Sequence, residues 1–513
     1  MSLLARTSIV SAATLLSRVL GFVRDAATAA VLGAGPVADA LVAALALPLL
    51  ARRLLAEGAF NLAFIPALAR AEDEGGAAPQ ALAAATLVLL FGLLLLCAVP
   101  ASIFMPQLIR LLAPGFEPGG QRADVAILCG RVAVLYLPLA GLAAIYGGVA
   151  NAAHRVTLPA LAPVAANMTV LSVIAVLIAD GLMESDAAAF AIALATVAAG
   201  VAQLVLMMIA ARGCPARPMF SRAMRARMGE RIGAALGVVR AASPALLFAG
   251  LSQFRLIIVA AAVSASPGAV AALNYAQRLM DLPLGLVGAS AGAVLVPALL
   301  RRQGAGEASE AAGRAVLAAL AFALPAATGL AVLAEPIVTV LFQRGSFDAD
   351  DARLTGALLA VLAVSLPAQG LERILSATAA TSGLVRAAER IALASLVLCV
   401  AAAAALGLGA GPTAAAGAVA LSAFASIGAL GTVLLRRGAL ALSRAVILSA
   451  LGLAAASAVM GGSVLALAAA WPAPEGQVPA AIRLAVLVGC GVAAYGGVGL
   501  GFKALLGRRI GPA

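Results

Sequence analysis

Apolar stretches alternate with short polar or basic segments along the whole chain. A helix needs about 20 mostly apolar residues to cross the hydrocarbon core of a bilayer. About fourteen stretches reach this length, and none shows the period-two alternation typical of strands. Their limits are 8–32, 37–68, 80–104, 124–150, 158–179, 186–211, 241–264, 269–299, 315–334, 354–378, 387–407, 413–435, 445–470 and 480–502. The pattern predicts an all-α polytopic membrane protein with fourteen transmembrane helices.

The distribution of basic residues fits this helix count, because short cytoplasmic loops of membrane proteins are enriched in Lys and Arg. If the N-terminus is cytoplasmic, most of the 34 basic residues fall in cytoplasmic segments. The loops expected outside hold only Arg110, Arg122, Arg344, Arg353 and Arg483. We therefore expect both termini to be cytoplasmic.

The chain also contains a repeat. Residues 16–48 resemble residues 251–283 without a gap: both begin with Leu-Ser, both hold a glycine at the same place (Gly33 and Gly268), and both end with Leu-Pro. An even number of helices separates the copies, which predicts two six-helix lobes in a parallel repeat, as in many transporters. The predicted domains are an N-terminal lobe at 1–211, a basic cytoplasmic linker at 212–240, a C-terminal lobe at 241–435 and two further helices at 445–502.

Composition narrows the class of protein. Hydrophobic residues make up 64% of the 513 residues and charged residues 11%, whereas soluble proteins carry about 25% charged residues. The net charge of +12 is explained by membrane topology rather than by nucleic-acid binding, because the basic residues sit in short loops. The five cysteines are scattered and read as packing residues, and His154 is the only histidine. We therefore expect no metal site, no cofactor and no histidine-dependent catalysis.

Eight arginines fall inside the predicted spans and need an explanation, because an arginine at the centre of a lipid-facing helix costs about 2.5–3.5 kcal/mol on insertion scales. They are Arg18, Arg24, Arg52, Arg53, Arg131, Arg255, Arg278 and Arg373. For Arg53, Arg131 and Arg373, a structural ion pair or a position near a helix end explains the charge as well as a functional role does. Glu57 and Glu372 are candidate structural partners.

Arg18, Arg52 and Arg278 fall too deep in their spans to reach the membrane surface easily. With Arg24, they can converge only if the two lobes enclose a wet cavity. Guanidinium groups match phosphate oxygens in bidentate fashion, and four of them suit a pyrophosphate better than a single carboxylate. Asp25 and Asp39, nearer the expected outer face, offset part of this charge. The residues alone thus indicate a two-lobed membrane carrier for an anion.

Seven stretches in order resemble the MurJ/MviN family of lipid II flippases, which belongs to the multidrug/oligosaccharidyl-lipid/polysaccharide exporter superfamily. They are "SRVLGFVRDA" (17–26), "GAGPVADAL" (33–41), "LPLLARRLLAEGAFNLAFIPAL" (47–68), "LAPGF" (112–116), "NAAHRVTLPALAPVAAN" (151–167), "YAQRLMDLPLGLVG" (275–288) and "FQRGSFDADDARLT" (342–355). The resemblance covers roughly residues 3–450. It implies a monomeric transporter of the bacterial inner membrane, and not an enzyme.

The resemblance also implies a mechanism of alternating access. The passenger would be lipid II, an undecaprenyl diphosphate that carries MurNAc-pentapeptide-GlcNAc, with its tail in a groove of the last two helices. The diphosphate-binding residues would be Arg18, Arg24, Arg52 and Arg278. The gate and supporting acids would be Asp25, Asp39, Glu57 and Asp281.

Two departures from the family pattern bear on ion coupling and on the site. Sodium-coupled members place an acid on helix seven, but this chain has no acid there and carries Arg255 instead. We therefore predict that it lacks a sodium site. The residue before the arginine of helix eight is the neutral Gln277, where the family commonly has an aspartate, and Asp281 stands where glutamate is frequent.

Three rival functions remain. A flippase for another polyprenyl-diphosphate-linked oligosaccharide would use the same arginines. A drug-cation antiporter fits less well, because an arginine-lined cavity repels cations. A membrane-embedded glycosyltransferase would need an outward-facing catalytic acid, and the available acids are Asp348, Asp350 and Asp351, which are better explained as a solvated turn.

Overall fold

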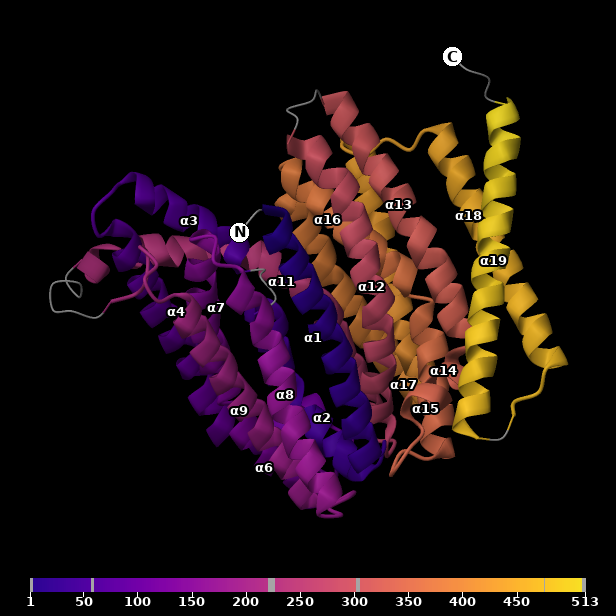
Figure 1. The fold of residues 1–513 in the computed structure, drawn as a ribbon, viewed down its shortest axis with the longest axis horizontal. Helices are drawn as coiled ribbons and strands as arrows, with labels where there is room; N and C mark the ends of the chain where they lie inside the picture. Colours follow the sequence, from indigo (N-terminus) through magenta and orange to yellow (C-terminus); the bar gives the residue numbers. More distant parts are fainter. Residues whose placement is uncertain (1–2, 57–59, 220–226, 301–304, 475, 510–513) are drawn as a thin grey trace. The chain divides into compact units, whose positions relative to one another are not determined.

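The computed structural model describes residues 3–56, 60–219, 227–300, 305–474 and 476–509. Within these ranges every regular element is a helix (Figure 1). This confirms the predicted all-α class. The apolar periods of the sequence account for the helices, because a backbone in lipid must satisfy its own hydrogen bonds.

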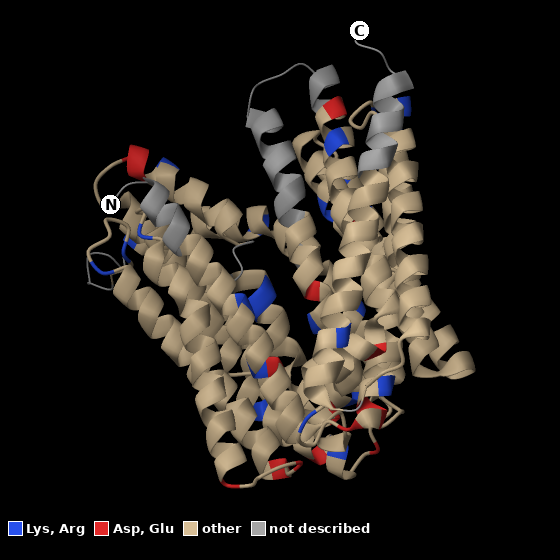
Figure 2. Ribbon diagram, turned by 45° about the vertical axis from the view of Figure 1, so that its right-hand side comes forward, with Lys and Arg blue, Asp and Glu red and all other residues tan. Residues whose placement is uncertain are grey.

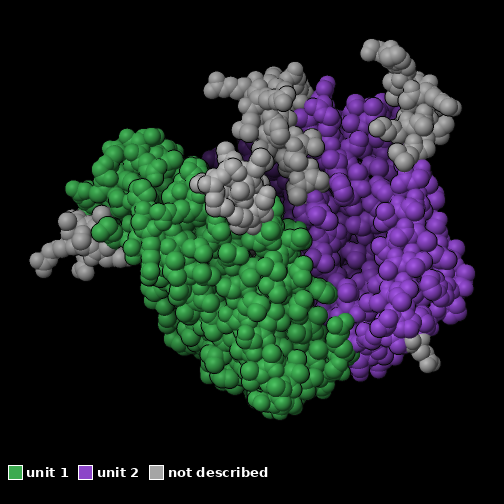
Figure 3. Space-filling model, viewed as in Figure 1, with its two compact units in different colours: residues 1–253, 264–271, 344–347 green, residues 254–263, 272–343, 348–513 purple. Residues whose placement is uncertain are grey.

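The helices group into two compact units (Figure 3). Unit 1 comprises Met1–Gln253, Ser264–Ala271 and Arg344–Phe347, and unit 2 comprises Phe254–Val263, Ala272–Gln343 and Asp348–Ala513. The division falls inside helices α11 and α12, and two short segments from the second half of the chain belong to unit 1. The predicted domain limits stay a prediction.

Unit 1 is a helical bundle whose elements follow the predicted spans in order. They are α1 (Leu3–Leu32), α2 (Pro36–Ala51), η1 (Arg52–Ala56), α3 (Asn61–Asp73), α4 (Ala78–Ile103), α5 (Met105–Leu112), α6 (Gln121–Ala133), α7 (Tyr136–Ala152), α8 (Thr157–Ala179), α9 (Asp186–Ala210) and the first part of α11 (Ile232–Val263). Helix α1 packs on α8, α8 on α9, and α2 on α6. These contacts place α1 and α2, which carry four of the eight predicted site residues, against the rest of the bundle.

The second predicted span is broken where its arginines lie. Pro48 stands inside α2, and a proline in a helix interior removes one backbone hydrogen bond. The chain then continues as the π-helical turn η1, which holds Arg52 and Arg53. Short π-helical turns are rare and occur frequently at functional sites.

The described part of the 212–240 segment packs on unit 1. Cys214, Ala216, Ala235 and Val238 belong to a buried apolar cluster with residues of α3, α4 and α7. A 2.5 Å ion pair joins Arg231 to Glu74, just after α3. The segment is therefore part of the unit 1 fold on its described residues, and its last residues begin α11.

Unit 2 contains the remainder of α11 and most of α12, followed by the later helices. Their bounds are α12 (Ala269–Leu300), α13 (Ala305–Val332), α14 (Ala334–Phe342), α15 (Ala349–Ala363), α16 (Leu366–Thr381), α17 (Val385–Arg436), α18 (Arg444–Ala470) and α19 (Gln477–Arg509). Helix α17 is interrupted at Gly411, whose φ of 83° is in the left-handed region, and Pro412 follows. It thus covers the two spans predicted at 387–407 and 413–435.

Among the described residues, fewer helices are long and apolar enough to cross a membrane than the fourteen that the sequence predicts. Eight described helices are long and apolar enough to cross a membrane, or up to ten if each of two bent pairs counts as one span. The predicted count of fourteen is therefore not confirmed. Helices α1, α2 and α12 are not among the eight, and all three carry the charged residues of the predicted site.

Candidate functional site

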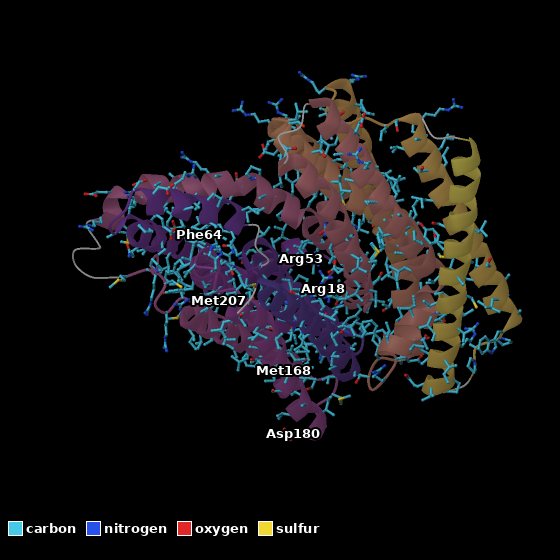
Figure 4. The ribbon with its side chains drawn as sticks, turned by 45° about the horizontal axis from the view of Figure 1, so that its top comes forward. Arg18, Arg53, Phe64, Met168, Asp180 and Met207 are labelled. Carbon is cyan, nitrogen blue, oxygen red and sulfur yellow. The ribbon has the colours of Figure 1, made fainter. Side chains whose placement is uncertain are left out.

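Charged residues are sparse along the middle of the described helices and gather at their ends (Figure 2). Arg18 and Arg24 on α1 are exceptions, six residues apart in the sequence and within one continuous helix. The Arg18 side chain is exposed on the protein surface. Figure 4 shows Arg18 and Arg53 well away from the end of unit 1 that Asp180 marks.

Arg24 is fixed by two partners. Its Nε and NH2 groups donate to Oδ1 of Asp25, at 3.0 and 2.6 Å. Its NH1 group donates to Oδ1 of Asn167 on α8, at 2.9 Å. Asn167 in turn donates from Nδ2 to the backbone carbonyl of Ser17, at 3.1 Å. Asp25, predicted as a gate residue, is therefore the ion-pair partner of Arg24.

This arrangement leaves Arg24 with hydrogen-bonding capacity for an anion. A guanidinium carries five N–H donors. Among the described residues, the three hydrogen bonds to Asp25 and Asn167 occupy three of these donors and leave one on each terminal nitrogen. Two donors are the number that bidentate pairing with a phosphate uses. Asp25 balances the charge of Arg24, so the donors contribute geometry and hydrogen bonding more than net charge.

The π-helical turn η1 holds the next two arginines. Arg52 is half-buried. Arg53 donates from NH1 to Oγ of Ser252 on α11, at 3.4 Å. This contact fits the structural role that the sequence allows for Arg53. Glu57, which the resemblance assigns to the gate, lies outside the described residues.

Asp39, on the first turn of α2, is fully buried. Its Oδ2 atom accepts a hydrogen bond from the backbone N–H of Gly268 at 2.7 Å, and Oδ1 accepts one from Ala271 at 2.8 Å. The Arg122 guanidinium lies 3.7 Å from Oδ2 and donates to the carbonyl of Ser264 at 3.0 Å. Asp39 therefore caps the N-terminus of α12, where an anion is favoured by the unpaired N–H groups and the helix dipole.

The end of α1 is closed by two other segments of unit 1. The backbone N–H of Ser346 donates to the carbonyl of Ala30 at 2.9 Å, and the N–H of Glu184 donates to the carbonyl of Val31 at 2.9 Å. These carbonyls belong to the last turn of α1 and have no later helical N–H to pair with. The loops that follow α8 and α14 thus supply the missing donors.

The second half of the chain contributes Arg278 and Asp281 on α12. Asp281 accepts a 2.9 Å hydrogen bond from Nε2 of Gln277, one helical turn earlier. Both residues belong to unit 2, whereas Arg18, Arg24 and Arg52 belong to unit 1. The convergence of the four arginines stays a prediction.

Sequence reasoning assigned no role to Arg255, and the structure gives it one. Its buried guanidinium pairs with Glu372 on α16 at 2.6 and 2.9 Å and with Ser395 on α17 at 3.0 Å. Ser426 donates to the same carboxylate. The sequence also missed Asn167 and Arg122 as partners of the predicted acids and arginines. The only signal for Asn167 was a single amide near the middle of an apolar helix.

Comparison with known proteins gives consistent matches. The family model described as "Lipid II flippase MurJ" matches residues 28–479. A "Probable lipid II flippase MurJ" of Rhizobium meliloti (strain 1021) is 36% identical over 373 residues, which cover 72% of this chain and 68% of the relative. The "Lipid II flippase MurJ" of Burkholderia cenocepacia is 31% identical over 376 residues, which cover 72% of this chain and 71% of the relative.

Solved structures show the same fold at low identity. A structure described as "Lipid II flippase MurJ, inward closed conformation" has a TM-score of 0.79 at 19% identity and covers 98% of this chain and 99% of its own. An inward-facing multidrug resistance MATE family transporter of the MOP superfamily has a TM-score of 0.62 at 17% identity, covering 85% and 98%. At these identities the likeness concerns the fold.

Proposed function

Because this chain belongs to the lipid II flippase MurJ family, we propose that it moves lipid II, the lipid-linked peptidoglycan precursor, between the leaflets of a bacterial membrane. The family match over residues 28–479 is the observation that carries this function. It confirms the resemblance drawn from the sequence and the prediction of a multi-pass transporter rather than an enzyme. Arg52 and Arg278 lie inside the matched residues, and Arg18 and Arg24 precede them.

The proposed mechanism is alternating access without covalent chemistry. Arg18, Arg24, Arg52 and Arg278 bind the diphosphate of undecaprenyl-diphosphate-linked MurNAc-pentapeptide-GlcNAc. The geometry of Arg24 supports this assignment, since Asp25 and Asn167 hold the group and, within the described part of the chain, two of its donors remain for an anion. The undecaprenyl tail stays in lipid along α18 and α19. The buried pair of Asp39 with the start of α12 supports its role as a gate.

Finer points of the proposal concern orientation and assembly. We place the chain in the cytoplasmic (inner) membrane with both termini in the cytoplasm, and flipping runs from the inner to the outer leaflet. The basic loops support this orientation. The protein acts as a monomer. The rival passenger, another polyprenyl-diphosphate-linked oligosaccharide, is not favoured by the names of the relatives.

The test uses a strain depleted of its own lipid II flippase. The wild-type chain is expected to restore growth and to move lipid II into the outer leaflet, measured by the accessibility of the headgroup to an added probe. Arg→Ala substitution at 18, 24, 52 and 278, one at a time, is expected to reduce this transport about tenfold or more, since a lost charge-assisted hydrogen bond costs about 1.5–3 kcal/mol.

The control is Arg353→Ala, which removes an exposed arginine on α15 and should leave transport unchanged. Full rescue by all four site variants contradicts the site. Polymerisation of glycan by the purified protein contradicts the transporter assignment. Transport of a different polyprenyl-diphosphate oligosaccharide in place of lipid II contradicts the passenger.

A further inference from the structure

The side chain of Asn167 joins α8 to α1, because it forms hydrogen bonds with both the Arg24 side chain and the Ser17 backbone. It is only 6% exposed, on an otherwise apolar stretch of α8. Its Oδ1 accepts from Arg24 at 2.9 Å, and its Nδ2 donates to the carbonyl of Ser17 at 3.1 Å. Because both ends of the amide are used, a flip of the amide would break both hydrogen bonds.

Asp25 and Asn167 constrain Arg24 in different ways. Asp25 is the next residue on the same helix, so the ion pair fixes the guanidinium only relative to α1. Asn167 belongs to α8, which packs along α1, so its hydrogen bond fixes the guanidinium relative to the bundle. The two helices lie close together here, since a Cβ added at Gly21 would be in ordinary van der Waals contact with Nδ2 of Asn167, at 3.5 Å.

The neutral amide also suits an anion site. Asp25 already compensates the charge of Arg24, and a second carboxylate at residue 167 would give the three side chains a net negative charge and repel a diphosphate. An amide oxygen accepts the hydrogen bond without adding charge. We propose that Asn167 is a positioning residue that holds the Arg24 guanidinium ready for the diphosphate of the passenger. This inference rests on the proposed function.

The experiment measures the dissociation constant of undecaprenyl diphosphate for the purified full chain in lipid nanodiscs. Asn167→Leu, of similar size, removes both hydrogen bonds, and Asn167→Ala is a second variant in case the first folds poorly. Each is combined with Arg24→Met in a double-mutant cycle. The matched control is Ser172→Ala on the same helix, because that exposed hydroxyl donates to the carbonyl of Met168, one helical turn earlier. Thermal unfolding of every variant is measured in parallel.

We expect Asn167→Leu to weaken binding about tenfold in the wild-type background and less than about twofold in the Arg24→Met background. A residue that only supports the fold would weaken binding by the same factor in both backgrounds, and that result overturns the inference. Unchanged binding by both Asn167 variants, with Arg24→Met clearly weakened, overturns the inference and leaves the proposed function in place. Wild-type protein that neither binds the probe nor moves lipid II overturns the proposed function itself.

Discussion

The Oδ2 atom of Asp39 on α2 accepts a 2.7 Å hydrogen bond from the backbone N–H of Gly268, immediately before α12. The pair joins a fully buried carboxylate to the start of a helix 229 residues later in the chain. A buried carboxylate is tolerated only if its oxygens are hydrogen-bonded, and helix N-termini present unpaired N–H groups. The carboxylate therefore gives the buried N–H group an acceptor, and the N–H group gives the buried carboxylate a donor.

Substituting Asp39 by Ala should lower the stability of the protein. The change leaves the N–H groups of Gly268 and Ala271 buried without their acceptor, and a buried unsatisfied donor costs about 1–3 kcal/mol. The change is measured by thermal unfolding in detergent, monitored by light scattering, or by denaturant-induced unfolding in detergent. The control is Asp124→Ala, an exposed acid in the first turn of α6. Equal shifts for the two variants would count against the capping role of Asp39.

Gly268 itself should resist substitution. Its φ of +80° is in the left-handed region, and a Cβ would lie 2.2 Å from the carbonyl oxygen of Ala34. We expect Gly268→Ala to destabilise the protein by at least about 1–3 kcal/mol through backbone strain, with the steric clash added. Gly35→Ala is the matched control, because Gly35 has a φ of −90° and nothing within 4 Å of an added Cβ. A similar loss of unfolding temperature in both variants would contradict this explanation.

The buried pair of Arg255 and Glu372 should be costly to break from one side. Removing one partner of a buried ion pair costs about 3–5 kcal/mol, because the other charge stays buried without compensation. Arg255→Met and Glu372→Leu are each expected to lower stability by this amount, and the double variant by clearly less than the sum. Chemical denaturation of the three variants measures the coupling.

An exposed ion pair in the same unit provides the comparison. Glu310 lies 3.7 Å from Arg314 on α13, and both side chains are more than half exposed. Exposed pairs contribute about 0–1 kcal/mol, so Glu310→Gln should change stability little.

For the buried pair, strict additivity in the Arg255 and Glu372 double variant would contradict the prediction, because it would show that the two charges do not depend on each other.

The ion pair between Glu74 and Arg231 should make the docking of the basic segment sensitive to acid. The hydrogen bond from Arg231 lowers the pKa of Glu74 from its usual value of 4.5. A group with a lowered pKa in the folded state stabilises that state above its unfolded pKa, and the contribution is lost as the pH falls through the folded value. Protease cleavage after Arg227 or Arg231 should therefore accelerate as the pH is lowered below about 4.5.

The Glu74→Gln variant is the control for this pH effect. Its cleavage at neutral pH should already match the faster cleavage of the wild type in acid, and it should lose the pH dependence in this range. An acid-stable protease with the same specificity on an unfolded reference peptide corrects for the enzyme's own pH profile. Wild-type cleavage that does not respond to pH would contradict a role for the pair in docking the segment.

The sequence by itself determined the all-α class, the membrane-spanning character, the order of the helices and the family. These follow from local signals: the length of apolar stretches, the placement of glycine and proline, and short motifs in a fixed order. The break in the second span was not predicted, since 37–68 read as one span, although Pro48 stands one turn before the π-helical turn that holds Arg52. The enrichment of Lys and Arg in the loops on one side of the membrane can likewise be read from the sequence without knowing which helices are in contact.

Only the tertiary structure decided which charge meets which partner. Asn167 lies 143 residues from Arg24, and Glu372 lies 117 residues from Arg255. In the sequence, Arg255 had no assigned role, and packing made it a partner of Glu372. A hydrogen bond depends on distances of about 3 Å between side chains on different helices. Helix periodicity fixes which face a residue occupies on its own helix, and it leaves open which other helix lies against that face.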